Sequence, residues 1–563
     1  MKVRPMMQCR CVMNKLFEEQ KIVNRMCSQS PQRDATVVPR LLHELIDGPT
    51  DDDIALVFGQ KRVSYRALRE HASRLAKGLS SIGLTKGDRL AIWLPNSDHW
   101  IALALACSRL GVGVVSVNIR WGAKEVGDIL ARTKCKALVL TPTFRDGACV
   151  KAVQAISSGE LEFLQTVIVQ SEIAAILDGV TQVSVDQLEI ESGDATGGGA
   201  EDEAFIVATS GTTSLPKLVV HTQGSVSRHV LDVAASTGLS DGQTCMLLAV
   251  PLCGAYGYTF GMAAMAGHSR VVLMEAFDPK EAADLIREHR VTHMMGTNDM
   301  LDKLLGTVPE TPPFPSLRMY GYANFVPSLT ELPAQAETRG IHIRGLYGMS
   351  ELLAGFAAQP SDAPLAQRAE GGGVPACPDA TFVIRNPETN EEVPDGTTGE
   401  LQVRTPNRMR EYIENPRATT MATTEDGYFR TGDLAYRLPD GTFVFVSRIA
   451  DVLRIGGYLV APDEIEDVIV SDPSVESAQV ISASLAQGER PIAFVVAHKG
   501  ATPNEGLLLE LCRGRLAKYK VPVRVFLIAS MPVVEGPNGI KTNKAALRKL
   551  ALELLSTDSG VRR

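Results

Sequence analysis

Short apolar runs alternate with amphipathic stretches through the first half of the chain. The runs at residues 90–94, 114–117 and 137–140 have the length of buried strands, and the stretches at 99–110 and 123–132 repeat apolar residues with helical spacing. Strand, helix and strand following one another at this spacing indicate parallel βαβ units. The alternation returns between residues 245 and 295. The pattern therefore predicts a large α/β domain with doubly wound, mixed sheets.

The pattern changes after about residue 380 to short strands separated by turn residues, as at 399–403 and 441–445, which predicts a smaller β-rich subdomain. Beyond Arg448, helices and strands alternate over roughly 110 residues, enough for an independently folded α+β unit. We expect a flexible N-terminal tail at residues 1–36, a large domain at 37–448 and a small, mobile C-terminal domain at 449–563.

Composition narrows the class of protein. A chain of 563 residues with 45% hydrophobic content is typical of a soluble globular protein with more than one domain. The net charge of -8 gives no support for a nucleic-acid partner. Ten scattered cysteines favour a reducing, cytoplasmic compartment, and no apolar run is long enough to predict integral membrane association. The basic N-terminal residues are interrupted by Glu18 and Glu19, which favours a flexible tail over a targeting peptide.

A hydroxyl-rich loop lies at residues 209–217, with the sequence Thr-Ser-Gly-Thr-Thr-Ser-Leu-Pro-Lys, between two apolar runs that predict strands. Its hydroxyls and N–H groups could wrap phosphate oxygens, Gly211 would allow a close approach, and Lys217 would add positive charge. A Walker loop fits badly, because no Gly precedes Lys217 and Leu218 stands where Ser or Thr would hold magnesium. On turn chemistry alone, a polar hairpin that binds nothing is the alternative.

A second polar segment, Tyr347 to Glu351, follows another predicted strand and would face the same crevice. An aromatic ring can stack on adenine, a hydroxyl can bond a phosphate, and a carboxylate is a hard oxygen ligand for Mg²⁺. The alternative is a helix start with a capping hydroxyl.

Taken together, these motifs resemble the adenylate-forming (AMP-binding) superfamily, which includes acyl-CoA synthetases, peptide-synthetase adenylation domains and luciferases. The resemblance covers residues 37–549, and the motifs follow the order of the family. The loop is similar to the family's TSGTTGxPK, with Ser214 in place of the second Gly. The resemblance implies that the β- and γ-phosphates of ATP are held by Thr209, Ser210, Gly211, Thr212, Thr213 and Lys217.

The other nucleotide contacts are also implied by the resemblance. The segment Tyr347-Gly348-Met349-Ser350-Glu351 resembles YGxTE, which assigns the adenine to Tyr347, the α-phosphate to Ser350 and Mg²⁺ to Glu351. The stretch Gly321-Tyr322-Ala323 is similar to the segment that lines the adenine and acyl pocket, and residues 428–433 resemble YxxTGD. The ribose is thereby assigned to Asp433 and Arg448.

The C-terminal motifs imply a moving domain. Gly456 and Gly457 match the strand that approaches the pantetheine channel of CoA, and Ala450 stands where the family has a hinge Asp or Lys. Residues 538–548 resemble the GKxxRxxLR tail, which identifies Lys541 as the catalytic lysine, with Lys544 as the competing candidate and Ile540 in place of a Gly. An ammonium placed there would stabilise charge as the reacting oxygens approach, whereas the alternative is a solvated basic helix.

The resemblance implies an ATP-dependent acid–CoA ligase that forms an acyl-adenylate and then a thioester. The segment Pro251 to Gly257 matches a family acyl-pocket segment, and Gly254 replaces a common gating His. This segment lacks the Asp with which amino-acid-activating relatives hold an α-ammonium, which favours an acid without an α-amino group. The alternatives are transfer to a carrier-protein thiol or to oxidation, and a catalytically silent nucleotide-binding regulator.

Overall fold

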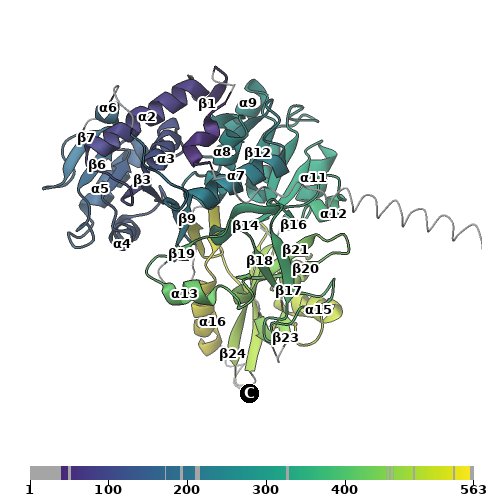
Figure 1. Cartoon of the computed structure of the whole chain (residues 1–563). Helices are drawn as coiled ribbons and strands as arrows, with labels where there is room; N and C mark the ends of the chain where they lie inside the picture. Colours follow the sequence, from purple (N-terminus) through teal and green to yellow (C-terminus); the bar gives the residue numbers. More distant parts are fainter. Residues whose placement is uncertain are drawn as a thin grey trace, which may run out of the picture. The chain divides into compact units, whose positions relative to one another are not determined.

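The computed structural model of the protein describes residues 40–48, 52–171, 173–190, 195–209, 216–324, 329–451, 453–455, 458–460, 462–485, 488–536 and 539–557. The expected tail at 1–36 lies outside these ranges. Within them, every helix is too short or too polar to cross a lipid bilayer. Figure 1 shows the elements along the chain.

An eight-stranded sheet carries the first series of βαβ units. Its order is β19 (Glu411–Tyr412), β9 (Leu218–Thr222), β8 (Glu203–Ala208), β4 (Gly113–Ser116), β3 (Arg89–Trp93), β5 (Ala137–Leu140), β6 (Thr166–Val169) and β7 (Thr181–Ser184). The pairs from β8 through β4, β3, β5 and β6 to β7 are parallel, as the sequence predicts. The last two pairs, β8 with β9 and β9 with β19, are antiparallel. The phosphate loop is therefore the connection of a hairpin.

Both faces of this sheet are covered. Within β3, Leu90 and Ile92 belong to one hydrophobic core and Ala91 and Trp93 to another, because successive strand residues point to opposite faces. The second core also receives α4 (Ala123–Thr133) and α5 (Ala148–Gln154), and the first receives α2 (Tyr65–Ser81) and α3 (Asp98–Leu110). This arrangement confirms the doubly wound architecture.

A thirteen-stranded sheet joins the second βαβ series to the β-rich region. Its order is β17 (Thr381–Arg385), β18 (Gly399–Arg404), β20 (Phe429–Arg437), β21 (Phe443–Arg448), β16 (Gly372–Pro375), β15 (Leu353–Ala358), β14 (Ile343–Met349), β13 (Met319–Ala323), β12 (His293–Thr297), β10 (Cys245–Leu248), β11 (Arg270–Leu273), β1 (Ile54–Phe58) and β2 (Lys61–Ser64). Pairing is parallel from β14 to β1 and antiparallel from β14 to β17. The change of pairing occurs at β14, which carries the Tyr347 motif.

Helices between the two sheets bind them into one core (Figure 1). Every residue of α8 (Ala255–Ala266) is buried, and α8 contacts α7 (Gln223–Thr237), β10 and β15. The ring of Tyr258 in α8 stacks on Phe205 of β8 with centroids 3.8 Å apart, and its edge meets Trp100 of α3. The aromatic stack thereby links the second series of strands to the first.

The large domain contains further, mostly short helices. They are the 3₁₀ helices η1 (Leu42–Ile46), η2 (Phe144–Gly147) and η3 (Ser350–Leu352) and the α-helices α6 (Val185–Leu188), α9 (Pro279–Glu288), α10 (Asn298–Gly306), α11 (Leu332–Thr338), α12 (Leu365–Arg368) and α13 (Pro416–Met421).

The C-terminal region has cores of its own. The strands β24 (Val475–Leu485), β25 (Gly488–Ala497) and β26 (Arg524–Leu527) form one sheet. One core contains residues of α14 (Pro462–Val470) and α15 (Glu505–Arg515), and the other contains residues of α16 (Lys544–Thr557). The region begins with the short 3₁₀ helix η4 (Ile449–Asp451). It also contains two antiparallel hairpins, one formed by β22 (Leu453–Ile455) and β23 (Tyr458–Val460), the other by β27 (Val533–Gly536) and β28 (Gly539–Thr542). A smaller α+β domain follows the large domain, as expected, and the boundary at 448/449 stays a prediction.

One local prediction is wrong. Tyr347 does not follow the strand, because β14 continues to Met349. Lys541 is a residue of β28, opposite Val534, so the alternative of a basic helix does not apply to it, and α16 begins at Lys544. Local apolar pattern does not mark these ends, since a strand ends where its partner stops pairing.

The aromatic stack generates a stability prediction. Phe205→Ala should lower the free energy of unfolding of the large domain by about 3–5 kcal/mol, because it leaves a cavity against Tyr258. Urea unfolding followed by tryptophan fluorescence measures this, since Trp93, Trp100 and Trp121 all lie in that domain. Phe163→Ala, at a ring that is 39% exposed, is the matched control and should change it by less than about 1 kcal/mol. Equal effects of the two substitutions would contradict the packing argument.

Candidate active site

Asp433 lies at the centre of a small polar cluster. It stands in β20 directly opposite Arg448 of β21, and the Arg448 Nε lies 3.7 Å from the carboxylate. The hydroxyl of Tyr347, on β14, donates to the other carboxylate oxygen at 2.6 Å. Asp433 and Tyr347 are buried, whereas half of the Arg448 side chain is exposed. Strand β14 and the hairpin of β20 and β21 therefore bring together predicted adenine and ribose residues that lie 86 residues apart in the sequence.

The ring of Tyr347 is held in place by other aromatic rings. Phe443 and Phe356 meet it edge to face, with centroids 5.3 and 6.3 Å away, and Phe445 packs at a tilt. Burial, and then the Asp433 charge, raise the pKa of Tyr347 well above its usual value, so this hydroxyl stays a hydrogen-bond donor. The stacking role expected for the ring stays a prediction.

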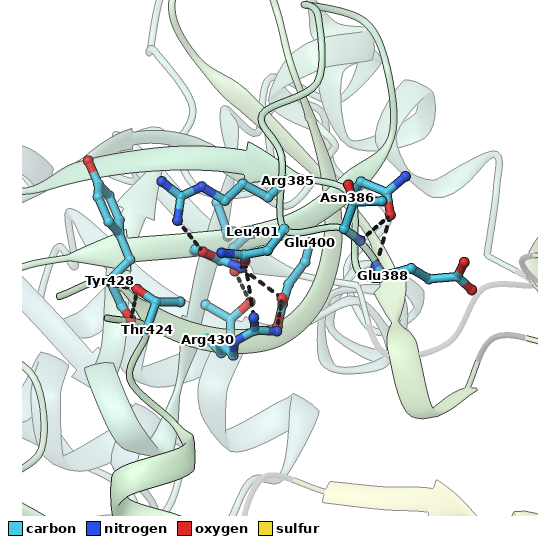
Figure 2. A network of polar contacts seen from close by, with 12 residues as sticks. Arg385, Asn386, Glu388, Glu400, Leu401, Thr424, Tyr428 and Arg430 are labelled. Carbon is cyan, nitrogen blue, oxygen red and sulfur yellow. Dashed lines mark hydrogen bonds and ion pairs between the residues drawn. The ribbon is translucent and has the colours of Figure 1, made fainter. Parts of the chain in front are cut away.

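The strand that carries Asp433 is anchored by a polar network (Figure 2). Thr431 donates to the Leu401 carbonyl at 2.6 Å and accepts from the Asp433 N–H at 3.0 Å. Close by, Arg430 forms an ion pair with the buried Glu400 at 3.1 Å. On β17, the second strand from β20, Arg385 pairs with Asp426 at 2.6 Å. Such partners stabilise buried polar groups and fix the strand that presents Asp433.

Glu351 occupies the turn after β14. It is 8% exposed, and the Tyr412 hydroxyl donates to its Oε1 at 2.8 Å. Its other carboxylate oxygen has no hydrogen-bond partner among the described residues. Because Mg²⁺ in nucleotide sites is commonly held by one or two carboxylates together with substrate phosphates, a single oriented carboxylate fits a magnesium ligand. The adjacent Ser350 is half-buried.

The turn that carries Ser350 and Glu351 is tightly constrained. Leu353 has φ 60° and ψ 164°, a region that side chains rarely enter and that costs about 1–3 kcal/mol. Gly348 has no room for a side chain, since an added Cβ would lie 2.7 Å from the Ala354 Cα. Two buried histidines hold this segment: His221 bonds the Ser350 carbonyl at 2.7 Å, and His229 bonds the Ala354 carbonyl at 2.9 Å.

Both histidines are neutral donors. A carbonyl only accepts, so the Nε2 of each ring carries the hydrogen. Burial lowers the pKa of His221 and of His229 to about 4, which keeps each ring uncharged at neutral pH.

The phosphate loop is described at its two ends. The Thr209 N–H donates to the Lys217 carbonyl at 2.9 Å, which closes the loop, and Arg132 bonds the Pro216 carbonyl. The Lys217 Nζ lies 4.6 Å from the centre of the Tyr412 ring. Lys217 is thus brought to the side chain that also holds Glu351. The intervening Ser210, Gly211, Thr212 and Thr213 lie outside the described residues.

The predicted adenine and acyl wall lies beside β14. Gly321, Tyr322 and Ala323 belong to β13, where Tyr322 is paired with Gly345 of β14. A side chain at position 321 would collide with Met295, and the Tyr256 hydroxyl donates to the Gly321 carbonyl at 3.1 Å. Burial raises the pKa of Tyr322 to about 12. These residues therefore lie on the strand next to the one that carries the Tyr347 motif, and their role in the adenine and acyl pocket stays a prediction.

The C-terminal candidates are described in part. Lys541 lies in β28 and Lys544 is the first residue of α16, whereas Gly456 and Gly457 lie outside the described residues. The catalytic role of Lys541 and the role of the glycine pair stay predictions.

Two residues that hold the Ser350–Glu351 turn, Tyr412 and His221, were not predicted from the sequence. Tyr412 lies in the two-residue strand β19, where Arg410-Glu411-Tyr412-Ile413 shows no periodicity. His221 interrupts the apolar run of β9, and a lone His in such a run is usually a core residue. The only available signal for His221 was its position a few residues after the phosphate loop.

Comparison with known proteins supplies the family. Residues 46–413 match the family model described as AMP-binding enzyme, and residues 464–535 match the model described as AMP-binding enzyme C-terminal domain. The chain belongs to the AMP-binding enzymes. This confirms the resemblance to the adenylate-forming superfamily drawn from the motifs.

Relatives of this AMP-binding enzyme include acid–CoA ligases. It is 29% identical over 484 residues to 2-succinylbenzoate–CoA ligase of Geobacillus kaustophilus, covering 86% of this chain and 92% of that protein. It is 26% identical over 505 residues to the medium-chain fatty-acid–CoA ligase of Escherichia coli, covering 88% of this chain and 87% of that protein. The crystal structure of ATP-bound MatB from Rhodopseudomonas palustris is similar with a TM-score of 0.79 and 25% identity, covering 92% of this chain and 99% of that one.

The Asp433 cluster generates a binding prediction for this AMP-binding enzyme. Asp433→Ala should weaken ATP binding about tenfold to a hundredfold, because hydrogen bonds to a charged group contribute about 1.5–3 kcal/mol. Isothermal titration calorimetry with ATP measures the dissociation constant. Asp395→Ala removes an exposed carboxylate and should leave it unchanged. An Asp433→Ala protein that binds ATP as the unmodified protein does would remove Asp433 from the ribose site.

Proposed function

We propose that the protein is an ATP-dependent carboxylic acid–CoA ligase that acts on a small acid without an α-amino group. One observation carries this proposal: Lys217, Glu351, Tyr347 and Asp433 come from three separate motifs, and hydrogen bonds and ring contacts join them in two adjacent clusters at the end of β14. In α/β proteins, ligands bind beyond the carboxyl ends of the strands. Residues gathered at the end of β14 are therefore expected to contact the phosphates, the metal, the adenine and the ribose of one nucleotide.

In the first reaction, a carboxylate oxygen of the acid attacks the α-phosphorus of ATP, the bond to the bridging oxygen breaks, and pyrophosphate leaves. Lys217 and the hydroxyl-rich loop bind the departing phosphates, while Ser350 hydrogen-bonds the α-phosphate. Bound Mg²⁺, held by Glu351, would neutralise phosphate charge. Asp433 and Arg448 orient the ribose. No protein nucleophile is needed, because the substrate supplies the attacking oxygen.

Lys541 is the main electrostatic catalyst of this step in the proposal, because its ammonium would neutralise the charge that builds up between acid and phosphate. In the second reaction the C-terminal domain turns about the segment at Ala450, Lys541 leaves, and Gly456 and Gly457 approach the pantetheine of CoA. The CoA thiolate then attacks the acyl carbon and AMP leaves. One site thereby serves two reactions.

The acyl acceptor is inferred from the relatives, and the class of acid is inferred from the acyl-pocket segment. The names of the curated relatives favour CoA, and a carrier-protein thiol is the second candidate. The acyl-pocket segment from Pro251 to Gly257 contains no carboxylate to hold an α-ammonium. We place the protein in the cytoplasm, since scattered cysteines, all reduced and buried where they are described, suit a reducing compartment.

A panel of carboxylic acids tests the function directly. Purified protein with Mg·ATP and CoA should release AMP in a manner that depends on one class of acid, and Glu351→Gln should abolish that release. AMP release that requires a carrier protein in place of CoA would favour the second acceptor. ATP binding without turnover on any acid would instead favour the silent homologue.

Lys541 has a separate test. Lys541→Ala should slow acid-dependent exchange of pyrophosphate into ATP about a hundredfold or more, because the charge that stabilises the adenylation transition state is lost. Thioester formation from added acyl-adenylate should persist. Lys544→Ala tests the competing candidate, and the exposed Lys549→Ala serves as the control. Unchanged exchange in Lys541→Ala would refute the assignment.

A further inference from the structure

Strand β9 directly follows the phosphate loop in the sequence and contacts the turn that carries Ser350 and Glu351. From β9 itself, the His221 ring bonds the Ser350 carbonyl at 2.7 Å. From β19, which pairs with β9 through Tyr412 and Val219, the Tyr412 hydroxyl bonds the Glu351 carboxylate at 2.8 Å. One contact fixes the backbone of the turn and the other fixes the carboxylate.

His221 is placed to act only through Ser350. Its side chain has no exposed surface, and its Nδ1 has no hydrogen-bond partner in the described part of the chain. A buried polar ring with a single hydrogen bond is costly in a strand core, where an apolar residue would pack without that cost. The contact that offsets the cost is the one with the Ser350 carbonyl, next to the strained Leu353.

Tyr412 lies between two groups of opposite charge. Its hydroxyl occupies Oε1 of Glu351 and leaves the second oxygen for another partner, while the Lys217 ammonium lies over its ring. The hydroxyl thereby restrains one oxygen of the carboxylate. Partners of metal-binding carboxylates commonly act in this way, by orienting the ligand.

We propose that Tyr412 and His221 are positioning residues that orient Glu351 toward the metal–nucleotide complex, in register with the phosphate loop. The inference rests on the proposed function, because the proposed function makes Glu351 the ligand of Mg²⁺. Neither residue needs to touch the acid or ATP. The β9–β19 pair thus sets the distance between the two polar motifs of the site.

The test for Tyr412 measures nucleotide binding rather than turnover. The dissociation constant of α,β-methylene-ATP is measured by calorimetry in saturating Mg²⁺ and in EDTA. The ratio of the constant in EDTA to the constant in Mg²⁺ reports how much the metal strengthens binding. Tyr412→Phe keeps the ring under Lys217 and removes only the hydroxyl, so the ratio should fall about tenfold while binding in EDTA stays unchanged. Tyr436→Phe, in β20 and away from Glu351, is the matched control and should keep the ratio of the unmodified protein.

His221 is tested by a pair of variants with the same ratio. His221→Leu removes the donor and should lower the ratio, whereas the side-chain amide of His221→Gln can reach the Ser350 carbonyl and should recover most of it. A purely packing role would predict the opposite order, since Leu replaces an apolar contact better than Gln. Should His221→Leu not fold, Tyr412→Phe still decides the proposal.

The outcomes separate this inference from the proposed function. If the unmodified protein turns over no acid but Tyr412→Phe still lowers the ratio, the ligase proposal fails and the positioning role stands. If Tyr412→Phe keeps the ratio of the unmodified protein, or if Mg²⁺ does not strengthen nucleotide binding at all, the positioning role is refuted, whatever the acid panel shows.

Discussion

A buried hydrogen bond from the Tyr347 hydroxyl to the Asp433 carboxylate joins the parallel part of the large sheet to its antiparallel part. A carboxylate removed from water must be partnered, and that of Asp433 accepts from this hydroxyl and faces the charge of Arg448, while the Asp433 N–H donates to the Thr431 hydroxyl. Loss of the Tyr347 hydroxyl would leave the buried carboxylate with less compensation for its lost hydration. The nucleotide residues on β14 and β20 can therefore hold only one relative position.

A second constraint acts at the end of the same strand. The turn after β14 contains a residue in a costly backbone conformation, and it persists because surrounding groups hold it. His221 and Tyr412 supply that support from the eight-stranded sheet, and His229 supplies it from α7. The protein carries a net charge of -8, so its binding of an anionic nucleotide depends on local positive groups such as Lys217 rather than on the overall field.

The sequence predicted the βαβ series well, because buried strands and amphipathic helices have periods that are visible in a short window. It also predicted Glu351, Asp433, Arg448 and Lys217 as nucleotide-binding residues through motifs that are compact along the chain. It left open whether the strands around the phosphate loop form a hairpin, and it did not predict the extent of β14, since both depend on which strand lies alongside. Tyr412 and His221 were missed because their partners lie 61 and 129 residues away.

The sequence by itself determined the class of fold, the family and the chemical groups available for binding a nucleotide, because each is written in local spacing and residue type. Only the tertiary structure decided which of those groups meet. The contacts of Tyr347 with Asp433, of Tyr412 with Glu351 and of Lys217 with Tyr412 each join separate strands. Their geometry follows from sheet register and core packing, which arise from long-range contacts that no short window of sequence contains.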